Sequence, residues 1–150
     1  MLDPIVDLSP GAEENELAAF FADSLRQNLR TNRRAQKSFG AMRATVHFVA
    51  VDTTESVTMR FDHGRVTVHE GTIGIPAVTF CGDRALVAGL TGVPLSSLLG
   101  LPLPAPSSPR DWAALRTLAR GLSDRRLIVY GFFSHPRLVT RILRVLSSRD

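Results

Sequence analysis

The chain has 150 residues, of which 44% are hydrophobic and 21% are charged, a balance that is ordinary for a globular protein and excludes a chain disordered throughout. This length allows one domain that buries roughly two thirds of the surface its unfolded form exposes. The net charge of +4 is unevenly spread, because residues 1–16 carry five acids and no base, which leaves a net charge of +9 on the rest of the chain.

These features bear on compartment and partners. No apolar run approaches the roughly 20 residues that span a bilayer, and the acidic start has none of the bases of a secretory or mitochondrial signal. The single cysteine, Cys81, excludes an internal disulfide framework and fits a reducing compartment. We therefore expect a cytoplasmic protein. Most of its 17 arginines are expected simply to face solvent. The alternative is that they contact anionic lipid headgroups or nucleic acid.

The first elements in chain order are an acidic tail and a helix. We expect residues 1–12 to be a tail and residues 13–150 to form one domain. Ser9 and Pro10, followed by two glutamates, are typical of a helix start. Apolar residues then recur at helical spacing: Leu17, Phe20, Phe21, Leu25 and Leu29.

Four predicted strands follow, at 44–52, 56–61, 65–70 and 76–81. The second and third alternate apolar and polar residues, which predicts one apolar face and one polar face. The loop 62–64 between them ends in glycine, as three-residue hairpin loops do when their last position needs a positive φ. We expect the polar face to be solvent-exposed and the apolar face to be buried. The polar residues are Thr58, Arg60, Thr67 and His69, and the apolar ones are Val57, Met59, Phe61, Val66 and Val68.

The second half of the chain alternates helices with one more strand. Asp83 is a good N-cap for a short helix over 84–90, and a short apolar segment follows. Four prolines indicate an extended linker over 101–109. Proline favours the first turn of a helix, so the remaining elements are predicted as a helix from Pro109, a strand over 126–132 and a helix from Pro136. Strands clustered as hairpins indicate an α+β fold with a mostly antiparallel five-stranded sheet and helices packed on one face.

The residues that usually carry chemistry form no recognisable set. No histidine stands at a metal-ligand spacing from another histidine or from Cys81. There is no Gly-x-Ser-x-Gly motif and no phosphate-binding glycine fingerprint, and the arginines are not interleaved with the aromatic residues that single-strand binders present. We therefore expect no metal, no cofactor, no nucleic-acid partner and no enzymatic activity.

An apolar surplus points to a different class of function. A filled core explains most of it, but the leucine-rich stretch 86–103 is broken by glycine and proline and is suited to lining the mouth of a small-molecule cavity. The residues alone leave two alternatives open, a filled core, which they favour, and a lipid-sized cavity between sheet and helices. The residues that would line such a cavity are Phe48, Met59, Phe61, Val78, Phe80, Leu86, Leu90, Leu98, Leu99, Val129, Leu138, Ile142 and Leu146.

Three stretches in this order resemble the sterol carrier protein type 2 family of lipid-binding domains. They are TVHFVAVDTTESVTMRFDHGRVTVHEG, PAVTFCGDRALVAGLTG and DRRLIVYGFFSHPRLVTRILRVL. The resemblance implies a non-catalytic carrier that holds a lipid in an apolar tunnel. We further expect the final helix to act as a lid whose arginines meet anionic headgroups at a membrane surface. The resemblance also implies an atypical insertion at about 93–122. The alternatives are an accessory domain that presents a lipophilic intermediate, such as a quinone precursor, to partner enzymes, or a basic nucleic-acid-binding module.

Overall fold

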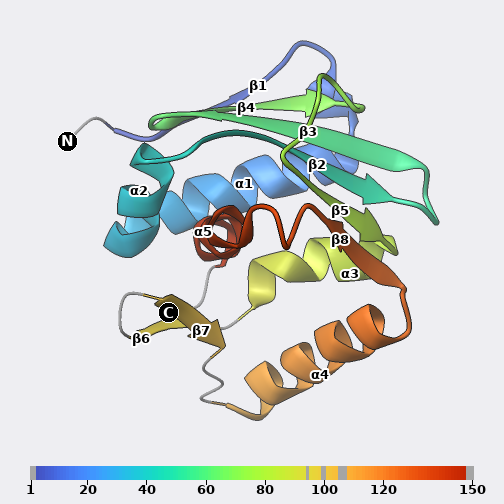
Figure 1. Cartoon of the computed structure of the whole chain (residues 1–150). Coiled ribbons are helices and arrows are strands. Elements are labelled where there is room, and N and C mark those ends of the chain that lie inside the picture. The colour runs from blue at the N-terminus through green and yellow to red at the C-terminus, as the bar shows by residue number, and fades with distance from the viewer. Residues whose placement is uncertain (1–2, 94, 99–100, 105–107, 148–150) are drawn as a thin grey trace.

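The computed structural model describes residues 3–93, 95–98, 101–104 and 108–147. Its centre is a six-stranded sheet with the strand order β1-β4-β3-β2-β5-β8. Helices α1, α2, α3 and α5 lie along one face of the sheet, and α4 and a small hairpin, β6–β7, lie beyond them (Figure 1). None of the described helices covers the other face. The six strands are β1 (Ile5–Leu8), β2 (Arg43–Ala50), β3 (Glu55–Asp62), β4 (Arg65–Glu70), β5 (Val78–Gly82) and β8 (Leu127–Tyr130).

The α+β class is confirmed, but the predicted five-stranded, mostly antiparallel sheet is wrong in detail. The pairs β2–β3, β3–β4 and β5–β8 are antiparallel, whereas β1–β4 and β2–β5 are parallel, so the sheet is mixed. The sixth strand, β1, lies inside the segment 1–12 that was expected to be a tail. Its backbone is tied to β4 at both ends, since Ile5 N donates to Gly64 O at 3.0 Å and Ser9 N donates to Val68 O at 2.9 Å.

The helices begin at residues that satisfy their free backbone N–H groups. Asn15 caps α1 by accepting from Ala18 N at 3.0 Å, and Asn32 caps α2 by accepting from Ala35 N at 2.9 Å. Proline occupies the first turn of α4 and of α5, as predicted. The helices are α1 (Glu16–Thr31), α2 (Arg33–Gly40), α3 (Arg84–Gly89), α4 (Pro109–Ser123) and α5 (Pro136–Leu146), with 3₁₀ turns η1 (Ala12–Glu14) and η2 (Leu90–Gly92).

Asp83 precedes α3, as predicted, but its side chain does not cap the helix. Its carboxylate instead accepts from Arg126 at 2.6 Å, so it ties the start of α3 to the residue before β8. The carboxylate of Asp52 accepts from Arg84 N at 2.8 Å in its place. The first turn of α3 is therefore satisfied from the β2–β3 turn, a partner that local sequence cannot indicate.

The predicted proline-rich linker is partly a strand. The pair β6 (Leu95–Leu98) and β7 (Leu101–Pro104) is antiparallel, with Leu95 opposite Pro104 and Leu98 opposite Leu101. Proline has no backbone N–H to donate to a neighbouring strand, so within sheets it is found mainly in edge strands. Both strands of a two-stranded sheet are edges, so this hairpin tolerates the prolines that argued for a linker.

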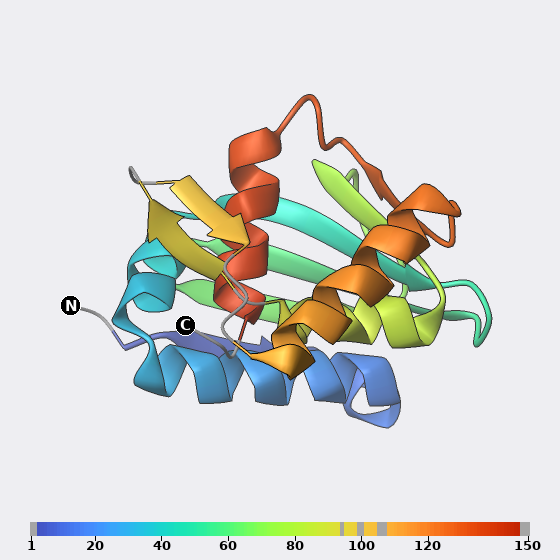
Figure 2. The same ribbon diagram turned by 90° about the horizontal axis from the view of Figure 1, so that it is seen from below.

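Helix α5 crosses under the middle of the sheet (Figure 2). Val139, Ile142, Val145 and Leu146 are all buried. Asn28 of α1 donates from Nδ2 to the carbonyl oxygen of Val145 at 2.6 Å, which satisfies one of the free carbonyls at the end of the helix. The expectation that the final helix acts as a lid is therefore wrong, because α5 is a central element of the core.

Candidate functional site

Eleven of the thirteen residues predicted to bind lipid belong to, or pack against, one hydrophobic cluster. Nine of the thirteen are fully buried in a single hydrophobic cluster, and Val129 and Leu138 are half-buried against it. Leu98 belongs to β6, and Leu99 lies outside the described residues. The nine buried residues are Phe48, Met59, Phe61, Val78, Phe80, Leu86, Leu90, Ile142 and Leu146.

Three aromatic rings occupy the centre of this cluster. The rings of Phe48 and Phe80 stack with centroids 5.1 Å apart, on the paired strands β2 and β5. Phe21 of α1 meets Phe48 from below, with centroids 4.6 Å apart. These distances are those of packed aromatic pairs. The inner face of the sheet is therefore filled with side chains at this point, and the proposed lining role of Phe48 and Phe80 remains a prediction.

Helix α4 differs from the other long helix in how little of it is covered. Seven residues of α1 are buried, whereas the buried residues of α4 are Asp111 and Gly121. Trp112 is 56% exposed, and Leu115 and Leu118 are half-buried. An amphipathic helix normally buries its apolar stripe. The apolar side chains of α4 are thus only partly covered by the rest of the chain.

Helix α4 approaches α3 closely at Gly121. A Cβ at Gly121 would lie 2.8 Å from Cδ1 of Leu86, so glycine lets α4 come down onto α3. Leu118, one turn earlier, packs against the core cluster, as do Val129 of β8 and Leu138 of α5. We call Leu115, Leu118, Val129 and Leu138 the half-covered set. The predicted lining includes the last two, whereas the helix of Leu115 and Leu118 was assigned to an atypical insertion at about 93–122.

Comparison with known proteins identifies the architecture. No protein-family model and no curated protein matches the chain. A solved structure described as a UbiJ-SCP2 ubiquinone synthesis protein superposes with a TM-score of 0.57 at 12% sequence identity, and covers 89% of this chain and 95% of that chain. The chain has an SCP2-like fold. This confirms the fold that the sequence resemblance implied.

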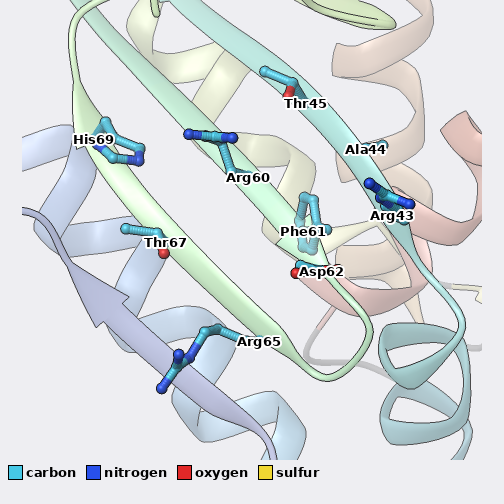
Figure 3. A pocket seen from close by; sticks show the side chains of 9 residues that line it. All are labelled: Arg43, Ala44, Thr45, Arg60, Phe61, Asp62, Arg65, Thr67 and His69. Atoms are coloured by element: carbon cyan, nitrogen blue, oxygen red, sulfur yellow. The ribbon is translucent and has the colours of Figure 1, made fainter.

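The outer face of the SCP2-like sheet carries a shallow polar hollow of about 670 Å³ (Figure 3). Arginines from three strands border it, namely Arg43, Arg60 and Arg65. Arg65 lies 3.5 Å from the carboxylate of Asp7 on β1. The lining is more polar than apolar, as predicted for this face, so it offers an acyl chain less apolar surface than the inner face does.

One predicted member of this polar face is buried instead. Thr58 is fully buried, because the loop that follows β4 folds over it. Its hydroxyl donates to the carbonyl oxygen of Gly71 at 2.7 Å and accepts from Ile73 N at 2.9 Å. His47 Nε2 lies 3.0 Å from the carbonyl oxygen of Ile73. The expectation that Thr58 faces solvent is therefore wrong, and its hydrogen bonds hold this loop against the sheet.

His69, also on the outer face, gives a pH prediction. Burial lowers its pKa from the ordinary 6.5, and the nearby charge of Arg60 lowers it further. The unfolded chain then takes up the proton at a higher pH than the folded chain, so the free energy of unfolding should fall as the pH drops through 6.5. Denaturant titrations of the wild type and of His69→Gln should show a flatter pH dependence for the variant; equal slopes would contradict this assignment.

No described helix of this SCP2-like chain is long and apolar enough to cross a bilayer. In the same part of the chain, no cluster of three His, Cys, Asp or Glu side chains is placed to hold a metal ion. Cys81 is a free, half-buried thiol in β5, opposite Val49 and Ile128 on the outer face.

Proposed function

We propose that the chain is a carrier that binds a lipid or another lipophilic small molecule against the half-covered set between α4 and the α3–α5 layer. The observation that carries the proposal is the apolar stripe of α4, a 15-residue helix with two buried residues. A ligand lying along Leu115 and Leu118 would complete the burial that the chain itself leaves unfinished.

The energetics of such a site need no catalytic group and no specific polar contact. Each methylene that leaves water contributes about 0.8 kcal/mol, so the free energy of binding grows with the length of the apolar chain. Binding sites of this kind are mostly apolar with few polar groups. Val129 and Leu138, which are half-buried, would contact the ligand directly, and the nine buried residues would remain part of the packed core beneath the site.

A second candidate function is presentation of the bound molecule to partner enzymes. It is favoured by one specific observation, since the solved structure with the matching fold is described as a ubiquinone synthesis protein. In this form the cargo is a lipophilic biosynthetic intermediate such as a quinone precursor. Affinity purification from the native cell should recover a biosynthetic enzyme in stable complex with the chain; recovery of the chain alone would contradict this second candidate and leave carriage itself standing.

The single tryptophan allows the binding site to be tested directly. Trp112 is 56% exposed at the start of α4, so titration with palmitate should shift its emission to shorter wavelengths as the ligand excludes water. The Leu118→Gln variant should bind palmitate about tenfold more weakly, because replacing the aliphatic side chain with an amide removes apolar contact worth about 1.4 kcal/mol of binding free energy.

The matched control is Ile128→Gln. Ile128 lies on the outer face of β8, next in the chain to the inward-facing Val129, and is 37% exposed. The same change of an aliphatic residue to an amide should leave palmitate affinity within about twofold, a difference under 0.5 kcal/mol. Equal losses in the two variants, or no emission shift in the wild type, would contradict the proposed site.

A further inference from the structure

The loop between β8 and α5 exposes two adjacent aromatic side chains. Phe133 is 94% exposed and Phe132 is 42% exposed. Their rings contact each other edge to face, with centroids 5.4 Å apart. Contiguous exposed apolar side chains are a common mark of a protein or membrane interaction surface. Nothing in the proposed carrier site uses them.

This loop is held in place at both ends. Gly131 has a φ of +84° and lies directly against the backbone of Ala77, where a Cβ would overlap the carbonyl oxygen. At the other end, His135 N donates to the carbonyl oxygen of Gly131 at 2.9 Å. In Figure 2 the loop forms the edge of the molecule opposite α1. The two phenylalanines are therefore presented by an anchored turn.

A third exposed apolar residue, Ile75, lies two residues before Ala77, whose backbone contacts this turn at Gly131. Ile75 is 94% exposed, and Ala77 is bonded to β2 through Ala77 N and the carbonyl oxygen of Thr45 at 2.9 Å. Tyr130, 57% exposed, ends the neighbouring strand β8. Aromatic residues of this amphipathic kind are enriched at membrane interfaces.

The surface beside the turn is cationic. A hollow of about 540 Å³ follows the loop, and Arg43, Arg137 and Arg141 border it together with His135. All three arginines are exposed, and no acidic side chain lines the hollow. Among the described residues none of the three forms an ion pair with a carboxylate within 4.0 Å. The sequence has no Asp or Glu from residue 125 to residue 149, and Asp62 faces Arg43 across the β2–β3 pair.

We propose that this end of the molecule is a docking surface for an anionic membrane. Phe132 and Phe133 enter the interface between headgroups and acyl chains, and the arginines of α5 and β2 meet the lipid phosphates. Apolar insertion and electrostatic attraction add in such binding, and each arginine near an anionic surface strengthens it severalfold. An extended charged surface fits the site better than a small free anion, because the arginines around the hollow are exposed rather than buried.

This docking goes beyond the proposed carriage of a lipid, because it needs no bound cargo. Purified full-length protein should sediment with vesicles of equal parts phosphatidylglycerol and phosphatidylcholine, and should stay in the supernatant with phosphatidylcholine alone. Binding should weaken as salt is added, since exposed charges are screened. Two double variants test the two parts of the surface. The first combines Phe132→Ser and Phe133→Ser, and the second combines Arg137→Gln and Arg141→Gln. Each should weaken vesicle binding by roughly tenfold or more.

The matched control removes two arginines from a different surface. Arg116→Gln with Arg120→Gln on α4 changes the net charge by the same amount and should leave vesicle binding within about twofold. Equal losses in the two arginine pairs would overturn the proposal in favour of general charge attraction. Failure of the wild type to sediment with the anionic vesicles would also overturn it, as would displacement by inorganic phosphate at constant ionic strength, which would assign the hollow to a free anion.

Discussion

Replacing Phe48 by alanine is expected to lower the free energy of unfolding by about 3–5 kcal/mol, the range typical of a phenylalanine truncated in a packed core. Phe48 is fully buried, is stacked on Phe80 and is in contact with Phe21, so the truncation leaves a cavity that its neighbours cannot fill. Guanidinium denaturation followed by circular dichroism measures the change.

The matched control is the same substitution at Phe133, which is 94% exposed. Phe133→Ala should change the free energy of unfolding by less than about 0.5 kcal/mol. The comparison also separates two roles of the inner sheet face. If Phe48 lined an empty tunnel in the cargo-free protein, its truncation would cost little more than that of Phe133, and that outcome would contradict the packed interior described above.

Replacing Gly131 by alanine is expected to lower the free energy of unfolding by about 2–4 kcal/mol, because backbone strain and steric overlap add. The residue has a φ of +84°, a conformation that costs an L-residue roughly 1 kcal/mol. In addition, the new Cβ would overlap the backbone of Ala77, which has no flexible side chain to move aside. Separating β8 from the start of β5 would relieve the overlap at the expense of sheet hydrogen bonds. Thermal and denaturant unfolding measure the loss.

Gly64→Ala isolates the contribution of the backbone contact. Gly64 also has a positive φ, +95°, but nothing lies within 4 Å of the position its Cβ would take. It should therefore show only the conformational cost of about 1 kcal/mol. Equal losses at the two glycines would contradict the contact between the β8–α5 turn and Ala77.

Elements defined by local pattern could be predicted from the sequence. The hairpin of β3 and β4 alternates over enough residues to indicate both of its faces, and proline at the first turn located the starts of α4 and α5. The inward face of Phe61, Met59 and their neighbours followed from the same alternation. Thr58 broke the rule because a loop 13 residues away in sequence folds over it.

Elements that depend on distant pairing could not be predicted. Strand β1 has four residues, too few for a period to be read, and it exists because β4, far along the chain, offers a parallel edge. Strand β5 was predicted as an element, but its pairing, parallel to β2 and antiparallel to β8, was not. The hairpin β6–β7 was hidden by its prolines, which normally exclude a strand.

The candidate site was predictable in composition but not in detail. Most of the predicted residues lie in one cluster, yet their side chains are buried against other side chains of the core. This burial depends on how closely α1 and α5 approach the sheet, which the sequence pattern does not indicate. Phe132 was placed at the end of a predicted strand, whereas β8 ends at Tyr130, so its exposure was missed. The available signal was the pair of phenylalanines in a stretch that carries five arginines and no acid from residue 125 to residue 144.

The central claim, that this SCP2-like chain carries a lipophilic molecule, is tested most directly by native mass spectrometry of the full-length protein purified without detergent. The account predicts a species heavier than the bare chain by one small molecule, which organic solvent releases and which palmitate restores. A spectrum with the bare chain alone, unchanged after incubation with palmitate and with lipid extract from the native cell, would contradict it.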